Sequence, residues 1–316
     1  MYSLNNKLKQ QKFLSDKYGS AFLKSSILHD SGVTMLTCCD HVTLFINNNG
    51  VPELSQIFFC KQKYCPTCSR RKSLKAYAVG MKLYEELAKE YAFLHVVLTV
   101  RNCDADDIRD TIRLLFKESS AMFKSKLCAG FKGVLRCLEI SHNEERGDFH
   151  PHLHCLVAVR KSYFTSRSYV SVESLRSEWA DRMKQTTASV YMSRIREPEK
   201  AIAEICKYCV KPLQLDGVPT HIYEILYMQT KHVRHMQSYG VIRETLAKLK
   251  LDFEKTDDIE VEYSLDEFDI NDFFEKGRRV AFSFDRTTKK YRPAETVANL
   301  RVDAVNSFRS VNLREK

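Results

Sequence analysis

A run of three histidines offers the most direct metal-binding chemistry in this sequence. The run is His150-Pro151-His152-Leu153-His154, and the apolar residues that follow it, as far as Val159, have the pattern of a strand. Side chains in a strand alternate between its two faces, so His152 and His154 are expected on the same side, ~7 Å apart along the chain. Two imidazoles in this arrangement can bind one metal ion. The alternative is a pair of ordinary hydrogen-bonded histidines.

A neighbouring strand can supply a carboxylate to the same ion. Residues 135–140 have a strand pattern, and the polar, glycine-containing stretch 143–148 predicts a turn between the two strands. The resulting hairpin brings Glu139 close to the paired imidazoles, so Glu139, His152 and His154 are the predicted ligands. Mixed imidazole and carboxylate ligation suits Mn²⁺, and Mg²⁺ is favoured by its abundance. His150 is expected to support this group from outside the ligand set.

A cluster of cysteines forms a second group of candidate ligands. Cys60 is followed by Cys65-Pro66-Thr67-Cys68, a turn in which two sulfurs can reach one ion, and Cys38 and Cys39 precede them. Expected strands at 42–46 and 56–59, joined by an Asn-Gly turn, can return one of the adjacent cysteines to this turn. Four thiolates form a closed tetrahedral zinc site. The predicted zinc ligands are Cys39, Cys60, Cys65 and Cys68, with Cys38 as the alternative to Cys39 and buried free thiols as the alternative to zinc.

The composition favours a polyanionic partner. The 316 residues carry a net charge of +10 and the pI is about 9.0, which indicates nucleic acid first and an anionic membrane second. Residues 252–275 hold eleven acidic residues and one basic residue, so the rest of the chain has 49 basic and 29 acidic residues. Most of the chain is therefore more basic than the total suggests.

Sequence features also indicate where the protein works. There is no apolar run of about 18 residues or more, so no membrane helix is expected. The first twelve residues are polar and rich in lysine, unlike a secretory signal. Eleven cysteines in such a chain favour reduced thiols and metal binding over disulfides. We therefore expect a cytoplasmic protein with no membrane partner.

Periodicity predicts the elements that position these groups. Arg70, Arg71 and Lys72 follow the cysteine turn and suit phosphate contacts, or alternatively they are the solvated start of a helix that continues to residue 90. The segment 161–171 is basic and rich in aromatic residues, so it can stack on single-stranded bases. The other expected elements are a buried strand at 93–102, an amphipathic helix at 104–126, a helix at 172–185, a short strand at 190–196 and a helical region at 213–251.

A further helix, expected between Pro198 and Pro212, places three reactive side chains on one face. Glu204 and Tyr208 are four residues apart, and Lys211 is three residues further on. An acid, a phenol and an amine in this order can carry chemistry. Taken alone, they are more often an ordinary surface stripe.

Together, these blocks resemble the plasmid rolling-circle replication initiators of the HUH endonuclease superfamily, in the class with a zinc knuckle and one catalytic tyrosine. The resemblance covers residues 33–212. The cysteine block continues through Arg70-Arg71-Lys72-Ser73-Leu74-Lys75, His150-Pro151-His152-Leu153-His154 is similar to the HUH motif, and Glu204-x-x-Lys207-Tyr208-x-x-Lys211 is similar to the tyrosine motif. Cys209-Val210 stands where a Ser-Gly pair is usual.

The resemblance implies an α+β fold, with a central antiparallel sheet, flanking helices, a small zinc-binding subdomain and a mixed C-terminal region. The segment rich in acidic residues also contains many aromatic and aliphatic residues, which argues against complete disorder. The expected domains are a polar N-terminal arm at 1–32, a zinc-binding subdomain at 33–75, an HUH nicking and strand-transfer domain at 76–250, and an acidic segment with a basic tail at 251–316.

The resemblance also implies an activity on single-stranded or hairpin DNA at a plasmid double-strand origin. Tyr208 would be the nucleophile and form a 5′-phosphotyrosine, while Glu204 would act as general base in the second cleavage. Lys207 and Lys211 would favour the phenolate, and Lys207 would also contact DNA. The implied cofactors are Mg²⁺ or Mn²⁺ and a structural Zn²⁺, and the implied partners are a host helicase and polymerase. The alternatives are an HUH-type transposase and a non-catalytic zinc-dependent DNA-binding protein.

Overall fold

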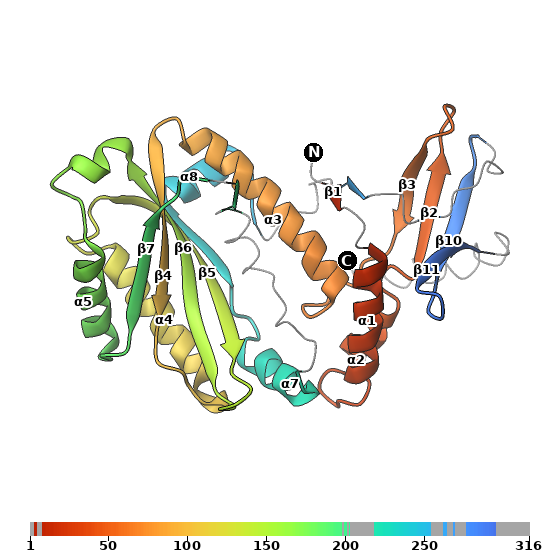
Figure 1. The fold of residues 1–316 in the computed structure, drawn as a ribbon, viewed down its shortest axis with the longest axis horizontal. Coiled ribbons are helices and arrows are strands. Elements are labelled where there is room, and N and C mark those ends of the chain that lie inside the picture. The colour runs from red at the N-terminus through yellow and green to blue at the C-terminus, as the bar shows by residue number, and fades with distance from the viewer. Residues whose placement is uncertain are drawn as a thin grey trace. The chain divides into compact units, whose positions relative to one another are not determined.

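A computed structural model of the chain describes most of its residues (Figure 1). Within that part the fold is α+β, with two larger antiparallel sheets and seven α-helices, which confirms the expected fold class. The chain divides into two compact units, residues 1–70 with 261–316 and residues 71–260. We call them the smaller and the larger unit. The described residues are 3–4, 8–197, 199–200, 202, 218–253, 262–263, 268 and 276–294.

A five-stranded antiparallel sheet forms the centre of the larger unit. Its strand order is β7-β4-β6-β5-β8, so the histidine-bearing strand β6 is the middle one. Residues 153–159 of β6 are all buried, because this strand pairs on both sides and is covered on both faces. The strands are β4 (Tyr91–Thr99), β5 (Phe131–His142), β6 (Phe149–Arg160), β7 (Ser189–Arg194) and β8 (Met236–Gly240).

Helices α4 (Ile108–Phe123) and α5 (Val172–Met183) cover one face of this sheet (Figure 1). The periodicity predicts a buried stripe of Ile108, Ile112, Leu115 and Phe116 in α4; the first three are buried and Phe116 is partly buried. Trp179 of α5 is fully buried, and its indole N–H donates to the Thr99 carbonyl at 2.8 Å. Two 3₁₀ helices, Ala105–Asp107 and Lys161–Thr165, precede α4 and follow β6.

Among the described residues, helices α3 (Pro66–Leu87) and α8 (Val241–Lys248) cover part of the opposite face of the sheet. Residues 71–87 of α3 belong to this unit, and they pack with α8 in one apolar cluster. Ile202 is 2% exposed and joins the same cluster. The other members include Ala76, Val79, Leu83, Phe93, Leu135, Cys137, Leu156 and Ile242.

The smaller unit combines two helices with a four-stranded antiparallel sheet. Helices α1 (Leu8–Phe22) and α2 (His29–Leu36) approach closely at two glycines, since a Cβ on Gly32 would lie 2.7 Å from the Gly19 carbonyl oxygen. The sheet order is β11-β10-β2-β3. Its strands are β2 (His41–Ile46), β3 (Pro52–Ile57), β10 (Arg279–Asp285) and β11 (Lys290–Pro293), and a short parallel pair joins β1 (Ser3–Leu4) to β9 (Glu262–Tyr263).

Two segments differ from the sequence expectation. The arm expected at 1–32 to be polar and partly helical contains α1 and part of α2. The expected basic tail contributes β10 and β11, with β10 paired to β2. The region 213–251 is not helical throughout, because β8 separates α7 (Thr220–Gln229) from α8 and pairs with β5. Pairing with the edge of β5, which is distant in sequence, thus makes residues 236–240 a strand although their local pattern favours helix.

The helices of the described residues differ from helices that cross a membrane. None of them combines sufficient length with sufficient apolar character.

The predicted Tyr208 helix falls mostly on residues 203–217, which lie outside the described residues.

Candidate functional site

The β5–β6 hairpin brings the predicted carboxylate and imidazoles together. Glu139 is directly opposite His152, and Cys137 is opposite His154, in the antiparallel register of the two strands. The predicted turn is present, with the Asn143 N–H donating to the Asp148 carbonyl at 2.9 Å. Because residues opposite each other share a face, Glu139, His152 and His154 all point to one side of the sheet.

The ligand atoms of these three side chains converge on one carboxylate oxygen. Glu139 Oε2 lies 3.1 Å from His152 Nε2 and 3.0 Å from His154 Nε2. Burial raises the pKa of Glu139, but hydrogen bonds from the two imidazoles outweigh burial and hold the pKa at about 2. The carboxylate is therefore ionised at neutral pH. One ionised oxygen donor and two imidazoles within 4.8 Å of one another fit a divalent cation.

The far sides of both imidazoles are also held. His152 Nδ1 lies 3.0 Å from the His150 carbonyl oxygen, which directs His152 Nε2 toward Glu139. His154 Nδ1 lies 3.2 Å from His95 Nε2 on β4, and the two rings are stacked with centroids 5.5 Å apart. Orientation of this kind is what metal-binding histidines require from their surroundings.

His95 was not identified from the sequence as part of this group. It lies inside an apolar stretch that predicts only a buried strand, and its contact with His154 depends on the pairing of β4 with β6. The one local signal is its alternation with Val97 and Thr99 on the less buried face of β4. His150 takes the supporting position expected for it, with Nδ1 2.8 Å from Asn102 Oδ1, and burial lowers its pKa.

Four cysteine sulfurs form the second group. Cys38 Sγ is 3.6 Å from the sulfurs of both Cys65 and Cys68, and Cys60 Sγ is 3.6 Å from Cys68 Sγ. A tetrahedral zinc with Zn–S bonds of ~2.3 Å has S–S edges of ~3.8 Å, so these distances fit one Zn²⁺. They are far longer than a disulfide bond of ~2.05 Å, and all four cysteines are free thiols.

The choice of Cys39 as fourth ligand is corrected by this geometry, because Cys38 takes that place. Cys39 has a left-handed backbone with φ of 53°, and its N–H donates to the Phe58 carbonyl at 2.8 Å. Its carbonyl accepts from the Tyr291 hydroxyl at 2.6 Å. These contacts fix Cys39 between distant segments, while the Cys38 sulfur faces the cysteine turn and accepts from the Cys60 N–H at 3.5 Å.

The crowded thiols influence one another's ionisation. Hydrogen bonds from Cys38, then Cys60 and Cys68, hold the pKa of Cys65 well below its ordinary value. The pKa of Cys60 is raised, first by its hydrogen bond with Cys38. Ionisation of Cys65 is therefore favoured, whereas ionisation of a second thiol such as Cys60 is opposed. A bound cation is needed for all four sulfurs to be thiolates at the same time. The position of the cysteine turn at the N-terminus of α3 also favours thiolate.

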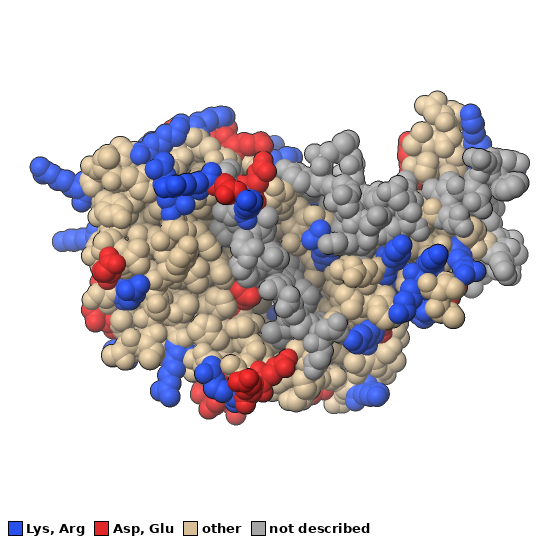
Figure 2. Space-filling model, in the orientation of Figure 1, with Lys and Arg blue, Asp and Glu red and all other residues tan. Residues whose placement is uncertain are grey.

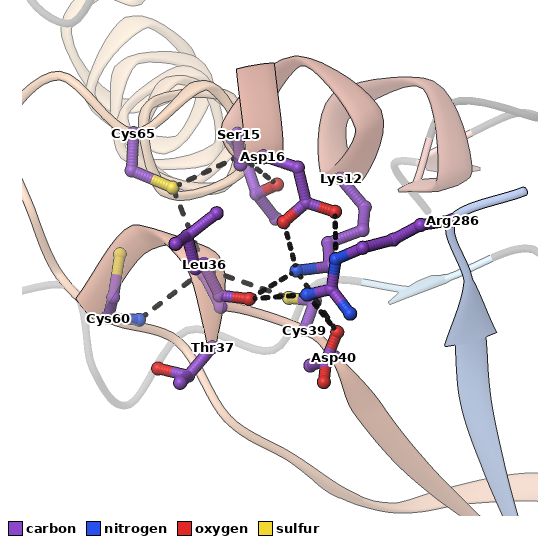
Figure 3. Close-up of polar contacts among 12 residues, drawn as sticks. Lys12, Ser15, Asp16, Leu36, Thr37, Cys39, Asp40, Cys60, Cys65 and Arg286 are labelled. Carbon is purple, nitrogen blue, oxygen red and sulfur yellow. Dashed lines mark hydrogen bonds and ion pairs between the residues drawn. The ribbon is translucent and has the colours of Figure 1, made fainter. Parts of the chain in front are cut away.

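A buried ionic network lies beside the cysteine group (Figure 3). Lys12 is fully buried, and its ammonium is 2.7 Å from Asp16 Oδ1 and 3.3 Å from Asp40 Oδ1. Arg286, in the β10–β11 turn, reaches the same two carboxylates at 3.2 and 2.7 Å. Both cations also donate to the Leu36 carbonyl. The two carboxylates offset the desolvation of the buried Lys12 ammonium, while the Arg286 side chain is half exposed. The network thus joins α1, the end of α2 and the β10–β11 turn.

The same helix α1 touches the cysteine turn directly. Ser15 Oγ is 3.3 Å from Cys65 Sγ and 2.9 Å from Thr67 Oγ1. No sequence signal pointed to Ser15 or Arg286, because their partners are far away along the chain, and the spacing of Lys12 from Asp16 does not reveal the distant contacts of Lys12 with Asp40 and Leu36. The N-terminal and C-terminal segments of the smaller unit therefore form the surroundings of the candidate zinc site.

The predicted phosphate-binding residues lie early in α3. Lys72 is exposed, whereas Arg70 and Arg71 are partly buried, so only Lys72 is fully available to a ligand. Figure 2 shows other Lys and Arg side chains gathered beside α1 and strands β10 and β11 of the smaller unit. Glu204, Lys207, Tyr208 and Lys211 lie outside the described residues.

Comparison with known proteins gives a consistent result. The family model described as "Replication protein" (Rep_1) matches residues 51–292, which include every candidate ligand except Cys38. The chain is 29% identical over 292 residues to "Protein rep" of Streptococcus pneumoniae, covering 89% of this chain and 90% of that protein. It is similar to proteins of the same description from Staphylococcus aureus (33% over 162 residues; 48% and 69% covered) and Bacillus amyloliquefaciens (27% over 260 residues; 73% and 76%). No solved structure matches it.

Proposed function

The chain belongs to the Rep_1 family of plasmid replication proteins that initiate rolling-circle replication, and on this basis we propose that it nicks DNA at its origin. The proposed reaction cuts one strand of a plasmid double-strand origin, presented as single-stranded or hairpin DNA, on an HUH endonuclease fold. The observation that carries the proposal is the convergence of Glu139, His152 and His154 on the β5–β6 hairpin.

These three residues would hold the catalytic cation in the proposed site. Mg²⁺ or Mn²⁺, when bound there, polarises the scissile phosphate and offsets the charge that develops on it. The chain contributes an ionised carboxylate and two imidazoles whose far nitrogens are engaged by His95 and by the His150 carbonyl. The cysteine group would hold a structural Zn²⁺ in the smaller unit.

Tyr208 is the proposed nucleophile. Its phenolic oxygen bonds to phosphorus as the bond to the 3′ oxygen breaks, which leaves a 5′-phosphotyrosine and a free 3′-OH. A phenol with a pKa of ~10 is only about one-thousandth ionised at neutral pH. The proton must therefore leave the phenol first, and the positive charges of Lys207 and Lys211 are proposed to favour the phenolate.

One described residue supports the placement of this tyrosine. Ile202 has a helical backbone and is buried against Cys137 and its neighbours in the core cluster. Cys137 and Glu139 are alternate residues of β5, so Ile202 packs on the sheet face that carries the candidate metal ligands. Tyr208 is six residues further along the sequence, and a helix of that length, as the sequence predicts, would span ~9 Å.

The products of the reaction define the proposed partners. A free 3′-OH on the nicked strand is a primer for a host polymerase, and a host helicase would separate the strands ahead of it. The reaction is proposed to take place in the cytoplasm. Origin DNA is the partner that family membership itself implies.

Replacing His154 with alanine tests the proposed activity. We expect the unmodified chain to convert a supercoiled plasmid carrying its origin to open circles with Mg²⁺ or Mn²⁺ and not with EDTA. His154→Ala should slow this conversion by ~10²-fold or more, because a metal ion supplies several kcal/mol of charge stabilisation. His29→Ala, at an exposed histidine of α2, is the matched control. Nicking that continues in EDTA, or that is equally fast in His154→Ala, would contradict the proposed metal site. Such a result would favour a non-catalytic DNA-binding protein.

Replacing Glu204 with alanine should separate the two cleavages. Glu204 is proposed to activate the water of the second, terminating cleavage, and loss of a general base slows such a step by ~10² to 10⁴-fold. The first nick should keep its rate. Single-turnover assays on labelled origin oligonucleotides measure both steps, and Glu199→Ala, at an exposed position on the same segment, is the control. Equal losses in both steps would contradict a role confined to termination.

A further inference from the structure

An exposed tyrosine lies on the same sheet face as the candidate metal site. Tyr191, on the edge strand β7, is 57% exposed. It pairs with Val97 of β4, and Val97 pairs on its other side with His154 of β6. Tyr191 and His154 therefore belong to one cross-strand row and share a face, separated by two strand spacings, or ~10 Å.

The Tyr191 ring is supported from the side of the metal site. It meets the His95 ring at a centroid distance of 6.1 Å and an interplanar angle of 74°, an edge-to-face contact. His95 is in turn 3.2 Å from His154, so the contacts run continuously from Tyr191 to a candidate metal ligand. A ring held in this way loses little conformational freedom when a ligand stacks on it.

The surroundings of Tyr191 leave room for a flat ligand and supply positive charge. Its neighbours on the same face of β7 are the small residues Ser189 and Ser193, and Ser189 is exposed. Arg101 is exposed two residues beyond Thr99, which pairs with both Ser189 and His152. An exposed ring flanked by small side chains, on the face of the candidate metal site, suits a stacked base. Arg101 is four residues along the chain from Val97, the β4 partner of Tyr191, and it offers positive charge to a phosphate further along the DNA strand.

We propose that Tyr191, supported by His95, stacks on a base of the single-stranded DNA close to the phosphate that is cleaved. The inference rests on the proposed nicking function for the identity of the ligand. Base–aromatic stacking contributes binding without sequence preference, because every base has a π face. Tyr191 would thereby fix the strand on the sheet without taking part in bond making or breaking.

The test compares Tyr191→Ala with Tyr191→Phe, using a twelve-nucleotide oligo-dT that carries one 2-aminopurine and an end label. Binding is measured by anisotropy in EDTA, so that it does not depend on nicking. Tyr191→Ala should raise the Kd by about 5- to 150-fold, the range that one stacked base implies. It should also abolish the quenching of 2-aminopurine fluorescence by the stacked ring. Tyr191→Phe keeps the ring and should match the unmodified chain in both measurements.

Met192→Ala controls for damage to β7, because Met192 is the next residue on the strand and points to the opposite face. Unmodified affinity and quenching in Tyr191→Ala would overturn the proposal. So would a Tyr191→Phe variant that binds as weakly as Tyr191→Ala, since the hydroxyl and not the ring would then be responsible. If the unmodified chain bound the oligonucleotide but failed to nick origin plasmid, the proposed nicking function would be wrong. The binding comparison would still decide whether Tyr191 stacks on a base.

Discussion

Tyr208→Phe is expected to abolish the covalent protein–DNA adduct while leaving DNA binding and metal binding unchanged. The substitution removes only the phenolic oxygen, which is the atom proposed to bond to phosphorus. The aromatic ring remains, so the fold should be unaffected. The predicted metal ligands are on β5 and β6, which the substitution does not touch.

The adduct is measured with an origin oligonucleotide labelled at one end or the other. A 5′-phosphotyrosine retains the downstream fragment, so a 3′-end label should appear on the protein in a denaturing gel and a 5′-end label should appear only on the released strand. Tyr227→Phe, at a partly buried tyrosine of α7, is the matched control and should form the adduct normally. Adduct that persists in Tyr208→Phe would assign the nucleophile to another residue, and adduct with the opposite label would reverse the polarity of the cut.

The metal group could be predicted because its geometry is local in sequence. The alternation of His152 and His154 follows from strand periodicity, and the hairpin that adds Glu139 needs only a short turn. His95 could not be predicted in the same way. Its contact with His154 requires the pairing of β4 with β6, strands whose residues are 59 positions apart, and a lone histidine in an apolar strand carries no signal of its partner.

The ligands of the cysteine group could be predicted only in part from local sequence. The turn at Cys65 and Cys68 is specified by its own spacing, whereas the choice between Cys38 and Cys39 depends on which sulfur faces it. That choice is made by contacts from Phe58 and from Tyr291, more than 250 residues away, which hold the Cys39 backbone. Strands β8 and β10 were missed for the same reason, because each is stabilised by pairing with a distant strand.

Cys38→Ser is expected to lose the bound zinc and to destabilise the smaller unit strongly. A structural zinc contributes ~10–16 kcal/mol of apparent binding free energy in small domains, which exceeds the stability of most domains as a whole. Serine keeps the size of the side chain but provides no thiolate. Because α1 contacts the cysteine turn through Ser15 and the β10–β11 turn through Asp16, loss of the metal should loosen α1 and the β10–β11 turn together.

Cys39→Ser is a stringent control, since Cys39 is the adjacent residue, is equally buried and carries the same side chain. Zinc per chain, released by a thiol-blocking reagent and quantified with a chromogenic chelator, should be about one in the unmodified chain and in Cys39→Ser, and close to zero in Cys38→Ser. Thermal unfolding should follow the zinc content, with a separate low-temperature transition in Cys38→Ser alone. The reverse pattern would return Cys39 to the ligand set, and full zinc in both variants would mean that the remaining cysteines bind it without either residue.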